Sequence, residues 1–359
     1  MINVTKSFFP PLELYQDYVK KIWANQWLTN NGALFKELSF KLKEKLAVNN
    51  IIPMTNGTLP LQIALNAFGK EGEIITTPFS YVATTAAIVW EKCTPVFVDI
   101  NADYLTIDET KIEAAITAKT TCILATHVYG NPCHVMAIDK IAKKYGLKVI
   151  YDAAHCFGVN YNGQSIFNFG DVSTCSFHAT KLFHTGEGGA IFCQDQSTLH
   201  EMKYRNSFGH NGQEEYFGLG INAKMSELQA AMGLSVLPYI DQIISNRKRV
   251  CDYYTQNLNF TNFSRLKLRA NTKWNYSYYP VIFNSEQELL NIKKKLSERN
   301  IMARRYFYPS LTKLPYVEPE QSVPIAEDIA VRILCLPLYP QLTESSCKKI
   351  VYIINLHDS

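Results

Sequence analysis

The chain has 359 residues, of which 47% are hydrophobic and 19% charged, a composition typical of a globular protein with one sizeable core and a second, smaller domain. Its net charge of +4 is too small to indicate a nucleic-acid partner, although it suits an anionic small molecule. Nine cysteines stand singly, without a Cys-x-x-Cys pair, which favours reduced thiols in a cytoplasmic protein over a disulfide framework.

The beginning of the chain and its apolar runs give no sign of a membrane partner. The opening "MINVTKSFFPPLELYQDY" lacks the basic-then-apolar layout of a signal peptide. Runs such as "TTAAIVW" are too short to cross a bilayer. We therefore expect a cytoplasmic protein that binds neither membranes nor nucleic acid.

Strand-like and helical segments alternate through the first two-thirds of the chain. The short apolar runs that predict strands are residues 73–80, 94–100, 120–130 and 147–154. The segments with helical spacing are residues 59–68, 81–92 and 135–146. Apolar strands separated by helices predict an α/β fold in which a mostly parallel, mixed sheet is covered by helices on both faces.

The pattern changes after about Gly233. Residues 237–258 predict a long connecting helix, followed by a strand at 275–283, a helix at 285–300 and a closing helix. We predict a large domain over residues 1–240 and a smaller C-terminal α+β domain over residues 241–359.

The first candidate binding segment is Asn56-Gly57-Thr58, just before the helix that starts at Leu59. In sheets of this kind, ligands bind where the strands end. Gly57 lets the backbone approach a ligand closely, and Thr58 offers a hydroxyl beside free N–H groups at a helix N-terminus. These features predict a phosphate site. A plain helix cap is the alternative.

Asp152 and Lys181 are the other two candidates. Asp152 ends an apolar run and could be a cap, an ion-pair partner or a functional carboxylate. Lys181 follows "SFHAT" and precedes a glycine loop, where a lone lysine is commonly a solvated charge. A phosphate site, a buried acid and a lysine in one crevice together fit pyridoxal phosphate (PLP). The lysine would form a Schiff base with the cofactor, and the acid would pair with the protonated pyridine nitrogen.

Seven motifs follow one another over nearly the whole length of the chain: "NGTLPLQIAL", "TTPFSYVATTAAI", "PVFVDI", "HVYGNPC", "VIYDAAHCFG", "SFHATK…GEGGAIF" and "GINAKMSELQAAMG". In these motifs and their order the chain resembles a known family, the sugar aminotransferases of the DegT/StrS type within the aspartate aminotransferase superfamily. This resemblance implies the PLP-dependent transferase fold of type I and PLP as cofactor. Relatives that dehydrate sugars have histidine in place of the lysine, so Lys181 favours transamination.

The resemblance implies a role for several of these residues. Lys181 would be catalytic and carry the cofactor, and Asp152 would pair with the ring nitrogen. Gly57, Thr58 and Ser176 would bind the cofactor phosphate.

Four further positions match the cofactor site and its surroundings. Tyr81 would stack on the face of the cofactor, with core packing as the alternative. Asn222 would reach the phosphate of the neighbouring subunit, which implies a homodimer with shared active sites. His155 stands where many relatives have a glutamine that bonds the cofactor's ring oxygen; histidine can still donate this bond, and the alternatives are pH-dependent tuning and a substitution without consequence. Lys224 stands where many have arginine, so bidentate recognition of an anion there is in doubt.

The "RRYFYP" loop, Arg304 to Pro309, is the candidate substrate contact. Its residues Arg304, Tyr306 and Tyr308 suit the diphosphate of a nucleotide or the carboxylate of the amino donor. A surface loop with a buried aromatic edge is the alternative. We expect no metal site, because His178, His184 and Cys175 do not complete a ligand quartet.

The expected reaction is amination of a nucleotide-linked keto-sugar. The segment 3–32, with "DAAHCFG" and "RRYFYP", resembles the branch of the family that forms dTDP-4-amino-4,6-dideoxyglucose (viosamine) from dTDP-4-keto-6-deoxyglucose. That resemblance implies glutamate as donor and a product for bacterial polysaccharide, such as the O-antigen of lipopolysaccharide. Amination at C3 of the isomeric 3-keto sugar is the alternative. A non-catalytic regulator with the same fold is a remote one.

Overall fold

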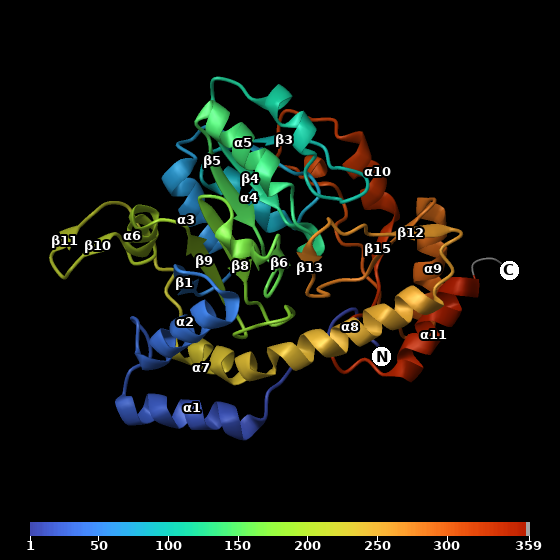
Figure 1. Cartoon of the computed structure of the whole chain (residues 1–359), viewed down its shortest axis with the longest axis horizontal. Helices are drawn as coiled ribbons and strands as arrows, with labels where there is room; N and C mark the ends of the chain where they lie inside the picture. Colours follow the sequence, from blue (N-terminus) through green and yellow to red (C-terminus); the bar gives the residue numbers. More distant parts are fainter. Residues whose placement is uncertain (357–359) are drawn as a thin grey trace.

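The computed structural model describes residues 1–356 and has a central seven-stranded sheet (Figure 1). In order of pairing, its strands are β1 (Ile51–Met54), β9 (Gly189–Cys193), β8 (Val172–Ser176), β5 (Lys148–Asp152), β4 (Thr120–Thr126), β2 (Glu73–Thr76) and β3 (Thr94–Phe97). The strands from β8 to β3 pair in parallel, and β9 is antiparallel to both its neighbours. The prediction of a mostly parallel, mixed sheet is confirmed.

Helices cover both faces of this sheet. Successive side chains of a strand point to opposite faces, so Ile123 and Tyr151 belong to one core cluster, and Leu124 and Ile150 belong to the other. The first cluster includes α2 (Ala33–Leu46), α5 (Val135–Tyr145) and α7 (Glu227–Val236). The second includes α3 (Leu59–Phe68), α4 (Val82–Trp90) and α6 (Gln196–Arg205).

The later part of the chain forms a second, smaller sheet. Its antiparallel strands are β12 (Phe263–Arg265), β14 (Pro280–Phe283) and β15 (Ile333–Cys335). The helices of this part are α8 (Ile240–Asn257), α9 (Glu286–Glu298), α10 (Pro324–Arg332) and α11 (Glu344–Asn355). Buried apolar side chains of α8, α9 and α11 form one core cluster with this sheet. A domain boundary at residue 240 remains a prediction.

The predicted helices are present with nearly the predicted bounds, but several predicted strands are shorter. The strand predicted over 275–283 is the largest difference, because only Pro280–Phe283 is extended in a sheet. The carbonyls of Tyr276 and Ser277 accept hydrogen bonds from the side chain of Arg247 instead of from a neighbouring strand. Tyr276 also has a φ of 57°, which strand geometry does not allow.

The first residues of the chain lie against its last third. Ile2 forms a parallel bridge with Ile301, and the N–H of Leu338 donates to the carbonyl of Val4 at 2.9 Å. The chain then crosses to α1 (Leu12–Asn25), which lies along α7 (Figure 1). The first residues of the chain therefore pack on the core of the smaller sheet, whereas α1 contacts a helix of the large one.

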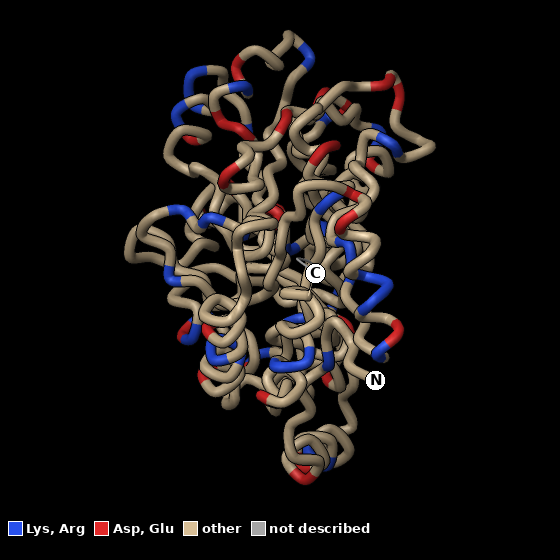
Figure 2. The backbone as a smooth tube through the Cα atoms, turned by 90° about the vertical axis from the view of Figure 1, so that its right-hand side faces the viewer, with Lys and Arg blue, Asp and Glu red and all other residues tan. Residues whose placement is uncertain are grey.

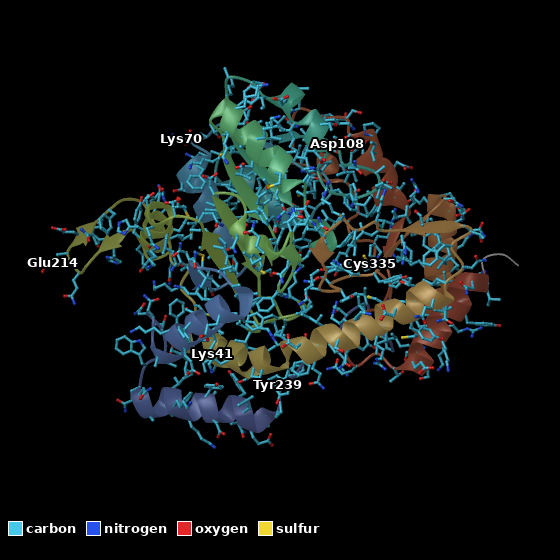
Figure 3. All side chains as sticks on the ribbon, viewed as in Figure 1. Lys41, Lys70, Asp108, Glu214, Tyr239 and Cys335 are labelled. Atoms are coloured by element: carbon cyan, nitrogen blue, oxygen red, sulfur yellow. The ribbon has the colours of Figure 1, made fainter. Side chains whose placement is uncertain are left out.

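A hairpin of β10 (His210–Asn211) and β11 (Glu215–Tyr216) extends from the body of the molecule, with Glu214 at its tip (Figure 3). The remaining short strands are β6 (Asn160–Tyr161), β7 (Gln164–Ser165) and β13 (Thr272–Lys273). Basic and acidic residues are interspersed along the backbone, as Figure 2 shows. Within residues 1–356, no helix is long and apolar enough to span a bilayer.

Candidate active site

The three segments singled out in the sequence meet at one edge of the large sheet. Strands β1 and β8 are both antiparallel to β9, and β5 is parallel to β8, so β1, β5 and β8 run in the same direction. Asp152 is the last residue of β5, Ser176 is the last of β8, and Gly57 follows the end of β1. The carboxyl ends of these strands form the crevice where ligands of such sheets bind.

Asp152 is a buried carboxylate without an ion-pair partner among the residues that the structure describes. It is 5% exposed, and it accepts hydrogen bonds from Thr84 Oγ1 at 2.7 Å and from the N–H of Ala154 at 3.1 Å. Burial raises the pKa of Asp152, and the two hydrogen bonds and the charge of Lys181 partly offset this rise. A cation placed beside the carboxylate would stabilise its charged form, as a protonated pyridine nitrogen does.

Lys181 lies in the loop between β8 and β9 and borders a cavity. Its Nζ is 3.4 Å from the hydroxyl of Tyr278, which the sequence did not indicate as a site residue. The cavity is also bordered by His155, Ser176 and Tyr306, so the structure brings these predicted residues together around the lysine. The arrangement places the amine of Lys181 and aromatic side chains around one cavity, which Asp152 itself does not border.

Gly57 lies in close contact with Ser176, and both residues belong to the predicted phosphate site. A β-carbon at position 57 would lie 2.7 Å from Cβ of Ser176 and 2.9 Å from its Oγ, both too short for non-bonded atoms. Only glycine therefore allows the backbone to approach the serine hydroxyl this closely. Backbone and hydroxyl donors in such a concave turn are typical of phosphate sites.

The N–H groups at this turn differ from the prediction. Oδ1 of Asn56 accepts the N–H of Thr58 and that of Leu59, both at 2.9 Å. The expectation of free N–H groups is wrong for these two residues, and Asn56 caps α3. The contact of Thr58 with a phosphate remains a prediction that rests on its hydroxyl.

His155 is buried in an aromatic wall of the site. Its ring stacks on Phe307 with centroids 5.7 Å apart and an interplanar angle of 8°, and it meets Tyr278 edge-on at 4.9 Å. Tyr81 is 52% exposed, and its ring centroid is 6.5 Å from that of Phe307. The stacking of Tyr81 on a cofactor remains a prediction.

The other predicted residues lie apart from Lys181 or on the surface. Asn222 is exposed, and its Oδ1 accepts from Lys224 Nζ at 2.7 Å beside the edge strand β1. Arg304 and Tyr308 are exposed in the loop that follows α9, and the guanidinium of Arg304 lies 4.6 Å from the ring centroid of Tyr306. Within this loop, only Tyr306 borders the cavity.

Several residues of the site were missed from the sequence. Thr84 donates a hydrogen bond to the carboxylate of Asp152. The sequence feature that could have indicated Thr84 is a pair of threonines inside an otherwise apolar helix. Tyr278 comes from the last third of the chain, and Thr5 comes from its first residues. No local pattern marks these two, since each reaches the site only through the tertiary fold. Phe307, which stacks on His155, lies in the "RRYFYP" loop but was not named among its site residues.

Comparison with known proteins agrees with this arrangement. The sequence profile of the DegT/DnrJ/EryC1/StrS aminotransferase family matches residues 13–355. The dTDP-4-amino-4,6-dideoxy-D-glucose transaminase of Shigella dysenteriae is 41% identical over 359 residues, covering 98% of this chain and 97% of that protein. The Escherichia coli protein with the same name is 40% identical over 365 residues, covering 98% of both chains.

Solved structures show the same fold. DesI, solved in the presence of its TDP-sugar product, has a TM-score of 0.94 and 28% sequence identity, with 99% of this chain and 92% of that chain covered. PseC, the Helicobacter pylori aminotransferase of pseudoaminic acid biosynthesis, has a TM-score of 0.90 and 24% identity, with 99% and 98% covered.

The site residues fit the cofactor of this family. The close contact of Gly57 with Ser176, which a β-carbon would fill, would suit the phosphate. Asp152 would offer a buried carboxylate to a cationic ring nitrogen, and Lys181 would offer the amine. The fold is therefore the PLP-dependent transferase fold of type I, the cofactor is PLP, and the chain belongs to the DegT/DnrJ/EryC1/StrS aminotransferase family.

Proposed function

We propose that this aminotransferase converts dTDP-4-keto-6-deoxyglucose to dTDP-4-amino-4,6-dideoxyglucose with glutamate as amino donor. The observation that carries the proposal is the 41% identity, over 98% of the chain, with the Shigella dysenteriae transaminase of that product. Lys181 and Asp152 support it, because both groups that transamination requires are present and the charge of Lys181 acts on the Asp152 carboxylate.

Asp152 and Lys181 have different roles in the acid–base chemistry of the proposed reaction. PLP, when bound, supplies an electron sink for the carbon that loses its proton. The Asp152 carboxylate, held by Thr84 and by the N–H of Ala154, keeps a proton on the pyridine nitrogen. Nζ of Lys181 would hold the cofactor until the amine of the donor displaces it, and the freed amine would then be placed to take a proton from the α-carbon of the donor and to give one to C4 of the sugar.

The surrounding side chains hold the reactants. Gly57, Thr58 and Ser176 bind the phosphate of the cofactor, and Tyr81 stacks on its ring. The hydroxyl of Tyr278, 3.4 Å from Lys181 Nζ, orients the amine between the two carbons that exchange protons.

The sugar nucleotide enters from the side of the "RRYFYP" loop. Tyr306 borders the cavity and contacts the sugar, whereas the exposed Arg304 and Tyr308 meet the diphosphate and base. The single amine of Lys224 contributes a point charge for an anion rather than a bidentate contact.

Assays with single sugars test the position of amination. The cofactor-loaded enzyme is given glutamate and either dTDP-4-keto-6-deoxyglucose or its 3-keto isomer, and the amino-sugar is identified by mass spectrometry and NMR. We expect turnover of the 4-keto sugar. Activity confined to the 3-keto isomer would overturn the proposal.

We also propose a homodimer in which Asn222 serves the site of the neighbouring subunit. The exposed position of Asn222, away from the cavity of its own chain, supports this role. Three large apolar side chains are exposed in the single chain, in α1, in α2 and in the segment between them: Trp23, Phe40 and Trp27. Such side chains suit a subunit interface. The enzyme would work in the cytoplasm and feed the O-antigen of lipopolysaccharide.

Mixed dimers test the shared site. Lys181→Ala removes the amine, and Asn222→Asp places a negative charge against the phosphate, so each pure homodimer should be inactive or nearly so. In a mixed dimer, the chain that keeps Lys181 faces a partner that keeps asparagine at 222, and activity should return. If mixing restores nothing although mixed dimers form, Asn222 acts within its own chain.

A further inference from the structure

Arg247, in the middle of α8, borders the same cavity as Lys181 and takes no part in the assignments above. Its side chain is buried, with only 5% of the residue exposed. Ser277 and Tyr278, which also border the cavity, lie beside it. Arginine is rarely buried this deeply unless an anion accompanies it.

The partners of Arg247 are neutral. Nε donates to the carbonyl of Tyr276 at 2.8 Å, and Nη2 donates to the carbonyl of Ser277 at 2.5 Å. Nη1 has no hydrogen-bond partner within residues 1–356, and no carboxylate there pairs with the guanidinium. Burial lowers the pKa of Arg247 to about 10, which still leaves it charged at neutral pH.

The lining of the cavity has positive charge and no compensating acid. The residues that border it include Lys181 and Arg247 but no aspartate or glutamate. His155 adds no negative charge. A carboxylate that enters this space would supply the anion that the guanidinium lacks. It could accept charge-assisted hydrogen bonds from Nη1, which has no partner within residues 1–356.

We propose that Arg247 binds a carboxylate group of the amino donor beside Lys181. The assignment rests on the proposed function only in requiring an amino acid as donor. The donor's amino group must meet the cofactor carbon at Lys181, and Arg247 borders the same small cavity, so one short molecule can contact both. A nucleotide diphosphate fits this position less well, because Arg247 is buried whereas Arg304 and Tyr308 are exposed.

The test separates the donor half of the reaction from the sugar half. Cofactor-loaded Arg247→Lys is mixed with glutamate alone, and loss of the yellow absorption gives the apparent dissociation constant of the donor. We expect this constant to rise about 10- to 100-fold, as for loss of a hydrogen bond between charged groups, with the KM of the keto-sugar nearly unchanged. Arg249→Ala is the matched control, since Arg249 lies on the same helix but is exposed.

Binding of 2-oxoglutarate, measured by isothermal titration, provides a readout that does not depend on turnover. 2-Oxoglutarate has both carboxylates of glutamate, but it does not react with enzyme whose cofactor has no amino group to transfer. Its affinity should fall in Arg247→Lys and stay unchanged in Arg249→Ala. Glutamine and isoglutamine, which each lack one carboxylate, identify the group that is bound. One of the two analogues lacks the carboxylate that Arg247 binds in glutamate. That analogue should bind to Arg247→Lys as tightly as to the wild type.

The outcomes are distinguishable from one another. If the wild type transfers amino groups from no amino acid, the proposed function fails. If the wild type is active and Arg247→Lys changes only thermal stability, or only the KM of the sugar, the carboxylate assignment is wrong and Arg247 clamps residues 276–277 or serves the sugar.

Discussion

The backbone N–H of Tyr129 donates a hydrogen bond to Nδ1 of His155 at 3.1 Å. Because Nδ1 accepts, the neutral imidazole carries its proton on Nε2, which is therefore the donor available to a ligand. Burial and the charge of Lys181 hold the pKa of His155 well below its usual range. His155 would thus offer a ligand a hydrogen-bond donor of fixed tautomer, as the amide of a glutamine would.

The lowered pKa of His155 has a consequence for stability. The unfolded chain takes up a proton at His155 as the pH falls through about 6.5, whereas the folded chain does not, so acidification favours unfolding. His155→Gln should therefore reduce the loss of unfolding free energy between about pH 7 and pH 5 by about 1–2 kcal/mol. Urea unfolding at the two pH values measures the difference, and the exposed His200→Gln is the control. Equal losses in wild type and His155→Gln would mean that folded His155 accepts a proton.

Thr84→Val should destabilise the site around Asp152. The substitution removes a buried donor at 2.7 Å and leaves one carboxylate oxygen without that bond, which costs about 1–3 kcal/mol. Thr85→Val is the matched control, because the hydroxyl of Thr85 is buried and unpaired within residues 1–356, so its removal should be neutral or stabilising. Thermal unfolding of the cofactor-free proteins compares the two. Equal effects would show that the bond to Asp152 contributes nothing.

Gly57→Ala should weaken the hold on PLP. The new methyl group would collide with Cβ and Oγ of Ser176, and relief of the overlap would push the serine hydroxyl from its place, at a cost of about 1–3 kcal/mol. The cofactor dissociation constant, followed by absorbance during dialysis, should rise by about tenfold or more. Gly218→Ala is the control, since the nearest atom to its β-carbon would be 3.8 Å away. Unchanged retention in Gly57→Ala would remove this contact from the phosphate site.

Lys181→Ala should abolish transamination and the covalent attachment of PLP while leaving the fold intact. The yellow absorption of the lysine-bound cofactor should vanish, and borohydride should no longer fix the cofactor to the protein. Lys143→Ala, which removes an exposed lysine paired with Asp139, should retain both properties. Attachment of the cofactor to Lys181→Ala would assign the covalent bond to another lysine.

The sequence predicts the parts of the site that depend on local pattern. Apolar runs alternating with helices give the parallel sheet, and its topology brings the ends of β1, β5 and β8 together, so Gly57, Asp152 and Ser176 could be assigned to one crevice. Lys181 follows Ser176 closely and shares its placement. These residues depend on strand order, which the spacing of elements largely determines.

The residues that were missed come from tertiary packing. Tyr278 was expected in a strand, but side-chain donors of Arg247 take the carbonyls of the residues just before it. The sequence around Tyr278 does not indicate that the hydrogen-bond partner of these carbonyls is Arg247 of α8. The cap at Asn56 is a similar case, because the same Asn-Gly-Thr letters fit a phosphate turn and a capped helix, and only the positions of the atoms distinguish them.

The pairing of the first residues with the last third of the chain also determines when the site is completed during synthesis. Val4 and Thr5 border the cavity, but the partners of this segment, Ile301 and Leu338, are translated much later. A nascent chain can assemble the sheet around Lys181 while this wall is still open. We therefore expect a ribosome-bound chain to be unable to enclose substrate until Leu338 has emerged from the exit tunnel.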